Sequence, residues 1–140
     1  MTRTNHALRA FLAASVLVTV PALGQTVVSP APPTPHSVTV KLIDQAGPKP
    51  FAFEPANFSA RRGDTLVFVQ ASTALHNVHF KSMAKGAKLG SRATSPYLTS
   101  KGQKYTLVVG PEFTEGTYEL VCEPHETLGM HGFLTVTGTH

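Results

Sequence analysis

The chain has 140 residues, of which 14% are charged, and its formal net charge is +4 at pH 7. This length suits a single domain of ordinary size, and the low charge content argues against charge-driven disorder. No Lys/Arg tract interleaved with aromatic residues is present, so the composition does not favour nucleic acid as a partner.

The first 24 residues are predicted to be a secretory signal peptide. Two arginines form a basic start, residues 10–20 are apolar, and Ala22-Leu23-Gly24 is a small-x-small cleavage site. The apolar run is shorter than the ~20 residues that span a bilayer, so we expect cleavage before Gln25 rather than a membrane anchor. We therefore predict an exported protein, periplasmic or secreted, without a membrane span after signal removal.

Residues 25–36 are predicted to be an extended linker, because this segment is rich in proline. From residue 37 onward, short runs of alternating apolar residues are separated by turn residues, which is typical of β-strands. The run 51–60 contains Pro55 and is expected to be an edge or bulged strand. Residues 81–103 lack periodicity and are predicted to be a long loop with a helical turn at most. The other predicted strands are 37–43, 65–70, 76–80, 104–109, 116–122 and 132–137.

Short strands with almost no helical period predict an all-β sandwich of seven to eight strands over residues 37–138. In the strand 116–122, the period of two places Tyr118, Leu120 and Cys122 on the face that points into the core. Glu119 and Val121 are then expected to point outward.

Cys122 is the only cysteine, so the chain has no internal disulfide. A free thiol in an oxidising compartment is a liability unless something occupies it, and metal ligation would do so. A buried, inert cysteine is the other interpretation of an isolated residue of this type.

The residues that follow Cys122 favour metal ligation. Cys122, His125 and Met130 have the spacing C-x2-H-x4-M, in a loop between two predicted strands. His76 begins another predicted strand and offers a second imidazole. Two histidines, one cysteine and a weak axial methionine are the ligands of a blue copper electron-transfer site.

The sequence resembles the plastocyanin/azurin (cupredoxin) family. The resemblance covers nearly all of residues 37–138 and is carried by Phe53-Glu54-Pro55, Gly63-Asp64-Thr65, His76-Asn77-Val78, Gly116-Thr117-Tyr118 and the loop 122–130. It implies a Greek-key β-sandwich and one type 1 copper ion held by His76, Cys122, His125 and Met130. It also implies that Asn77 ties the two ligand loops together and that redox partners, a cytochrome or a copper enzyme, dock near His125. Pro124 has no N–H to donate to the cysteine sulfur.

Enzyme functions fit the sequence less well than an electron carrier does. Multicopper oxidases, which resemble this fold, flank the cysteine with histidines, whereas Val121 and Glu123 flank it here. A binuclear centre would need a second cysteine, and a Cys-His hydrolase would need an orienting partner for His125. A copper-delivery protein remains the open alternative, since its ligands would be similar. We expect a monomer that is not an enzyme.

The charges along the chain are unevenly distributed. Residues 81–104 hold six basic residues and no acid, and the following residues hold five acids and no Lys or Arg. We hypothesise that the basic segment steers an acidic partner if it flanks His125; two faces that only confer solubility are the other interpretation. His79 and His131 are not expected to be copper ligands, and His131 is expected at the surface or beside the site.

Overall fold

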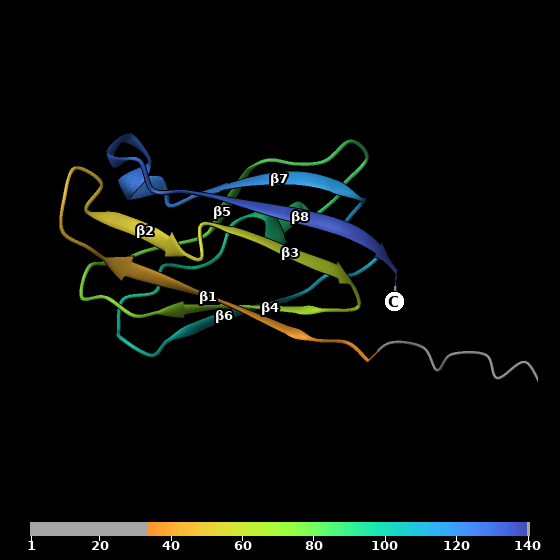
Figure 1. Cartoon of the computed structure of the whole chain (residues 1–140), viewed down its shortest axis with the longest axis horizontal. Coiled ribbons are helices and arrows are strands. Elements are labelled where there is room, and N and C mark those ends of the chain that lie inside the picture. Colours follow the sequence, from red (N-terminus) through yellow and green to blue (C-terminus); the bar gives the residue numbers. More distant parts are fainter. Residues whose placement is uncertain (1–33, 140) are drawn as a thin grey trace, which may run out of the picture. The chain divides into compact units, whose positions relative to one another are not determined.

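The computed structural model describes residues 34–139, which form two four-stranded sheets packed against each other (Figure 1). The first sheet has the order β2-β1-β4-β6 and the second β3-β8-β7-β5. The pairs β1–β4 and β3–β8 are parallel and the others antiparallel. The strands are β1 Ser37–Asp44, β2 Phe51–Glu54, β3 Asn57–Arg62, β4 Thr65–Gln70, β5 His79–Ser82, β6 Lys104–Val108, β7 Gly116–Val121 and β8 His131–Thr139. The predicted all-β sandwich is therefore confirmed.

Two 3-10 turns interrupt the strands. η1 (Gly90–Ala93) lies within the long segment that was expected to be a loop with a helical turn, and η2 (Glu123–Leu128) connects β7 to β8. Neither turn, nor any other helix among residues 34–139, is long and apolar enough to cross a membrane. The predicted signal peptide and most of the predicted linker lie outside the described residues.

The strand sequences alternate as the pleat requires. In β4, Leu66, Phe68 and Gln70 are buried while the residues between them are half-buried, because successive side chains point to opposite faces. The buried faces of the two sheets meet in one core, in which Phe53, Phe68, Phe80, Phe113 and Tyr118 are the largest fully or nearly fully buried side chains.

Two strand predictions need correction. The run 51–60 is not one strand, because the chain leaves the first sheet after β2 and enters the second as β3; both pieces are edge strands, as expected for this run. The predicted strand 76–80 begins only at His79, since His76 forms an isolated bridge with Leu98 across a loop. This bridge places His76 at the end of the sandwich where β1 and β4 finish.

Val121 was expected to point outward from the core, and it is nevertheless fully buried. It does lie on the face opposite Leu120 and Cys122, directly between His79 of β5 and His131 of β8. Residues opposite each other on neighbouring strands project to the same side, so these two half-buried imidazoles flank it. Its burial depends on these two neighbouring strands, which the pattern of β7 alone does not include.

Candidate metal centre

The 3-10 turn η2 lies in the loop that carries Cys122, His125 and Met130. Cys122 directly follows β7, and the chain returns to β8 after Gly129, which has a φ of 84°. A Cβ there would make only an ordinary contact of 3.4 Å with the methylenes of Lys49, so it is the backbone conformation that favours glycine. The Met130 N–H donates to the His125 carbonyl at 3.2 Å, and the Cys122 N–H donates to the Met130 carbonyl at 3.3 Å. These bonds close the loop onto the strand ends.

Three donor atoms converge at this end of the sandwich. Cys122 Sγ is 3.5 Å from His76 Nδ1 and 3.4 Å from His125 Nδ1, and the two nitrogens are 3.1 Å apart. Among residues 34–139, this is the one cluster of three or more His, Cys, Asp or Glu side chains that is compact enough to hold a metal ion. The centre of this triangle is about 1.9 Å from each corner, close to the ~2.0–2.3 Å of metal bonds to imidazole nitrogen and thiolate sulfur.

Burial controls the protonation of these donors. His76 and Cys122 are fully buried, whereas His125 is only partly buried. Burial, followed by repulsion from His125, lowers the pKa of His76, and burial lowers the pKa of His125. Burial also raises the pKa of the Cys122 thiol, although the backbone N–H groups of Asn77 and His125 oppose this effect. Both imidazoles are therefore neutral, with a lone pair free for a metal, and metal binding must displace the thiol proton.

Asn77 joins the two loops that carry the donors. Its Nδ2 donates to Glu123 Oε2 at 2.6 Å, and its Oδ1 accepts from the Glu123 N–H at 2.9 Å. Asn77 is almost fully buried, so both of its polar atoms depend on these bonds. Pro124 occupies the first turn of η2, where a missing N–H costs no helical hydrogen bond.

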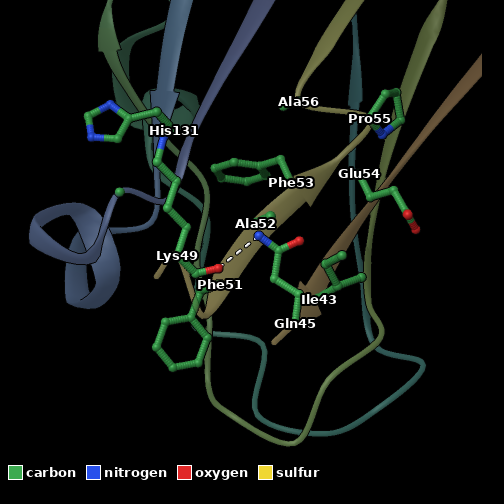
Figure 2. A pocket seen from close by; sticks show the side chains of 11 residues that line it. Ile43, Gln45, Lys49, Phe51, Ala52, Phe53, Glu54, Pro55, Ala56 and His131 are labelled. Atoms are coloured by element: carbon green, nitrogen blue, oxygen red, sulfur yellow. Dashed lines mark hydrogen bonds between the residues drawn. The ribbon is translucent and has the colours of Figure 1, made fainter. Parts of the chain in front are cut away.

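Phe51, at the start of β2 in the first sheet, covers the imidazoles of His76 and His125. Its ring stacks on His125 with a centroid distance of 3.8 Å and meets the edge of His76 at 5.6 Å. Phe51 also lines a groove of about 300 Å³ that runs beside the loop, and Figure 2 shows Lys49 extending along it toward His131. None of the three converging donors lines this groove.

Neither His79 nor His131 belongs to the donor cluster. His131 Nδ1 lies 2.9 Å from Glu119 Oε1, and His79 Nδ1 lies 2.7 Å from Thr94 Oγ1. Both side chains are about one-third exposed. They lie on the outer face of the second sheet, next to the metal loop.

Comparison with known proteins agrees with this geometry. Residues 38–137 match the sequence model of the copper-binding proteins of the plastocyanin/azurin family. The chain belongs to this family. It is 32% identical over 114 residues to plastocyanin from Prochlorothrix hollandica, which covers 81% of this chain and 82% of the relative. It is 34% identical over 101 residues to plastocyanin from Scenedesmus fuscus, and the match covers 71% of this chain and 98% of the relative.

Solved structures show the same fold. The oxidised plastocyanin from Dryopteris crassirhizoma superposes with a TM-score of 0.59 at 26% identity, covering 71% of this chain and all of that one. A pseudoazurin from Sinorhizobium gives a TM-score of 0.52 at 25% identity, and the match covers 73% of this chain and 74% of the pseudoazurin. The resemblance read from the sequence is thus confirmed, and with it copper as the metal: the mixed thiolate and imidazole donors are those that copper takes in blue copper sites.

Met130, the fourth ligand that the family resemblance implies, is fully buried and packs in the same core cluster as Cys122. Its backbone carbonyl accepts the Cys122 N–H. The side chain lies in the same interior as the thiol, and its role as an axial ligand stays a prediction.

The fold splits the basic segment of this cupredoxin between two ends of the sandwich. The Lys85 carbonyl accepts from Thr114 Oγ1 at 3.0 Å and the Lys88 N–H donates to the Glu112 carbonyl at 2.8 Å. These partners precede β7, so both lysines lie at the end of β7 opposite Cys122. Lys101 and Lys104 instead flank a turn whose Gly102 N–H donates to the carbonyl of Gln70, at the end where His76 lies. The basic segment as a whole therefore does not flank His125.

Two polar residues lie behind His76 and were not predicted from the sequence. Ser72 Oγ lies 2.8 Å from His76 Nε2, and Asp44 Oδ1 lies 3.7 Å from the same nitrogen. Asp44 ends β1, 32 positions before His76 in the chain, and its position in the sequence carries no signal of this contact. Only the parallel pairing of β1 with β4 brings the two together.

Proposed function

We propose that this chain is a mononuclear type 1 (blue) copper electron carrier, with copper held by His76, Cys122, His125 and Met130. The observation that carries the proposal is the convergence of two imidazole nitrogens and one thiol sulfur within 3.1–3.5 Å of each other. Three such atoms facing one another have no better common partner than a soft cation.

When bound, copper supplies a one-electron couple between Cu(II) and Cu(I). The chain's own residues keep the donor positions fixed in both states. His76 and Cys122 are held in a close-packed interior, and the loop that carries His125 is tied to the His76 loop through Asn77 and Glu123. A rigid, water-excluding frame of this kind reduces the rearrangement that accompanies electron transfer.

The mature protein is proposed to act outside the cytoplasm, in the periplasm or as a secreted protein. Residues 1–24 would be removed as a signal peptide, residues 25–36 would form a linker and residues 37–138 the copper domain. Intact-mass measurement of the exported protein tests this. A species that begins at Gln25 is expected, and an exported species that retains the first 24 residues would contradict it.

His125 is proposed as the point where electrons enter and leave, with a cytochrome or a copper enzyme docking over it. It is the one nitrogen donor that is partly exposed, and Leu128 beside it is also exposed. We propose a carrier rather than an enzyme, because the fully buried His76 and Cys122 leave little access for a substrate at the metal.

Copper delivery is the alternative function, and kinetics separate the two. A carrier should exchange electrons rapidly with itself and with a redox partner while retaining its copper. A delivery protein should instead pass copper to an acceptor chelator or protein faster than it exchanges electrons.

The site type is tested by optical and paramagnetic-resonance spectra of the copper-loaded chain. Intense visible absorption from a Cu(II)–thiolate bond is expected, and Cys122→Ser should abolish it, because no other thiol exists in the chain. His131→Ala is the matched control, since it removes a nearby imidazole that lies outside the donor cluster, and it should stay blue. A colourless parent or a blue Cys122→Ser variant would overturn the proposal.

A further inference from the structure

The two histidines of the donor cluster differ in what lies behind them. In each ring Nδ1 faces Cys122, so Nε2 points away from the site. Behind His76, Nε2 meets Ser72 Oγ at 2.8 Å and Asp44 Oδ1 at 3.7 Å. Among residues 34–139, no hydrogen bond to Nε2 of His125 is present, and Phe51 covers that ring by stacking.

The direction of the hydrogen bonds behind His76 can be derived from chemistry alone. Gln70 Nε2 donates to the carbonyls of Leu98, at 2.9 Å, and Ala74, so its Oε1 is the atom that faces Ser72 at 3.2 Å. The other oxygens around the Ser72 hydroxyl are the Ala74 carbonyl and the Asp44 carboxylate, which only accept. If His76 Nε2 were a further acceptor, the Ser72 hydroxyl would face acceptors only and could satisfy just one of them. A proton on Nε2 instead gives the hydroxyl a donor and leaves the proton of Ser72 for Gln70 or another acceptor. This pairing favours the Nε2–H tautomer of His76, with the Nδ1 lone pair directed at Cys122 and His125.

Asp44 adds a negative charge to this arrangement. Its Oδ2 accepts from the Thr73 N–H at 3.2 Å and from the Thr73 hydroxyl at 3.4 Å. The Asp44 side chain is 40% exposed and accepts these hydrogen bonds, so it is a carboxylate at neutral pH. At 3.7 Å it is too far from Nε2 for a direct hydrogen bond but close enough for a strong charge interaction.

We propose that Ser72 and Asp44 are positioning residues that fix the Nε2–H tautomer of His76, strengthen its Nδ1 as a donor and so lower the reduction potential of the copper site. A carboxylate behind a ligating imidazole raises the basicity of the ligand. The added negative charge stabilises Cu(II) more than Cu(I), because Cu(II) carries the greater positive charge. The inference rests on the proposed copper site and adds two residues that act on it through His76.

The metal-free protein gives the first test. Nitrogen-15 NMR of the imidazoles should show His76 as a single Nε2–H tautomer in the parent chain. Ser72→Ala should convert it to a mixture of tautomers, whereas Asp44→Asn, which keeps the Ser72 contact, should leave it largely Nε2–H. A parent His76 protonated on Nδ1, or a Ser72→Ala variant with an unchanged single tautomer, would overturn the proposal.

The second test is the reduction potential of the copper-loaded protein, together with Cu(II) and Cu(I) affinities from competition with chelators. Asp44→Asn should weaken Cu(II) binding about tenfold relative to Cu(I), and a tenfold change in a one-electron couple raises the potential by about 59 mV. Glu54→Gln is the matched control: it also removes one carboxylate, but from an exposed pair with Lys41, and it should leave the potential nearly unchanged.

The Asp44 side chain is 40% exposed, so the Asp44→Asn variant should fold even if the Ser72→Ala variant does not. An unchanged or lowered potential in Asp44→Asn, or an equal rise in Glu54→Gln, would refute the role of Asp44. These outcomes are separate from failure of the copper site itself, which a colourless parent protein would reveal.

Discussion

The two sides of the metal centre are built in opposite ways. His76 is fully buried at the end of the β1–β4 pair, with hydrogen-bonded polar groups behind its ring. His125 sits in a 3-10 turn, partly exposed, and is held from one side by a stacked ring. One side provides a fixed, electrostatically defined donor, and the other provides an accessible one. A single metal site thus combines rigidity and access by drawing its two nitrogens from different environments.

Removing the hydrogen bonds that connect the two sides should have the largest effect on stability. Asn77→Ala removes both bonds to Glu123 and leaves the Glu123 N–H without its partner. We expect the free energy of unfolding of the metal-free protein to fall by about 1–3 kcal/mol, measured by chemical denaturation. Asn57→Ala, at an exposed position in β3, should have little effect. Equal losses in the two variants would show that Asn77 does not join the loops.

Met130 tests whether the loop side also contributes the axial ligand. Met130→Gln should retain copper while lowering the reduction potential, because a harder oxygen donor favours Cu(II). A shift of about tenfold in relative affinity corresponds to about 59 mV. Voltammetry measures it directly. A potential equal to that of the parent chain would place the Met130 sulfur away from the metal.

Phe51 tests how far the His125 side depends on stacking. Phe51→Ala should lower the free energy of unfolding by about 1 kcal/mol through loss of the ring pair, and NMR should show a more mobile His125 ring. The His76 tautomer should not change, because that side is held by Ser72. Phe133→Ala, on the exposed face of β8, serves as the control. A mobile His76 in Phe51→Ala would erase the distinction between the two sides.

The smallest effect is expected from Lys85 and Lys88, which lie at the end of β7 opposite Cys122. β7 has six residues and spans ~20 Å, beyond the ~8–10 Å over which salt screens charges. Lys85→Glu/Lys88→Glu should therefore change the rate of electron transfer to the native partner by less than about twofold at physiological salt. Lys101→Glu/Lys104→Glu, at the metal end, should change it more. A larger change in the Lys85→Glu/Lys88→Glu variant than in the Lys101→Glu/Lys104→Glu variant would contradict this account.

Local pattern was enough to predict the sandwich and the ligand loop. The period of two placed Tyr118, Leu120 and Cys122 in the core, and all three are fully buried. The spacing from Cys122 to Met130 lies within one short loop, so its geometry follows largely from the nearby strand ends. Such short-range features are encoded in adjacent residues.

Features that depend on distant contacts were beyond the sequence. Asp44 meets His76 only because β1 and β4 pair in parallel, and nothing in the alternating pattern specifies this pairing. The burial of Val121 depends on neighbours from two other strands. The division of the basic segment depends on the loop after β5 packing against the residues before β7.

A crystal structure of the copper-loaded chain, with anomalous scattering recorded at the copper edge, tests the central claim most directly. We predict one copper ion bonded to Cys122 Sγ and to the Nδ1 atoms of His76 and His125, with the Met130 sulfur as a more distant fourth ligand. Copper bound through Nε2 of either histidine, or located away from Cys122, would contradict the account.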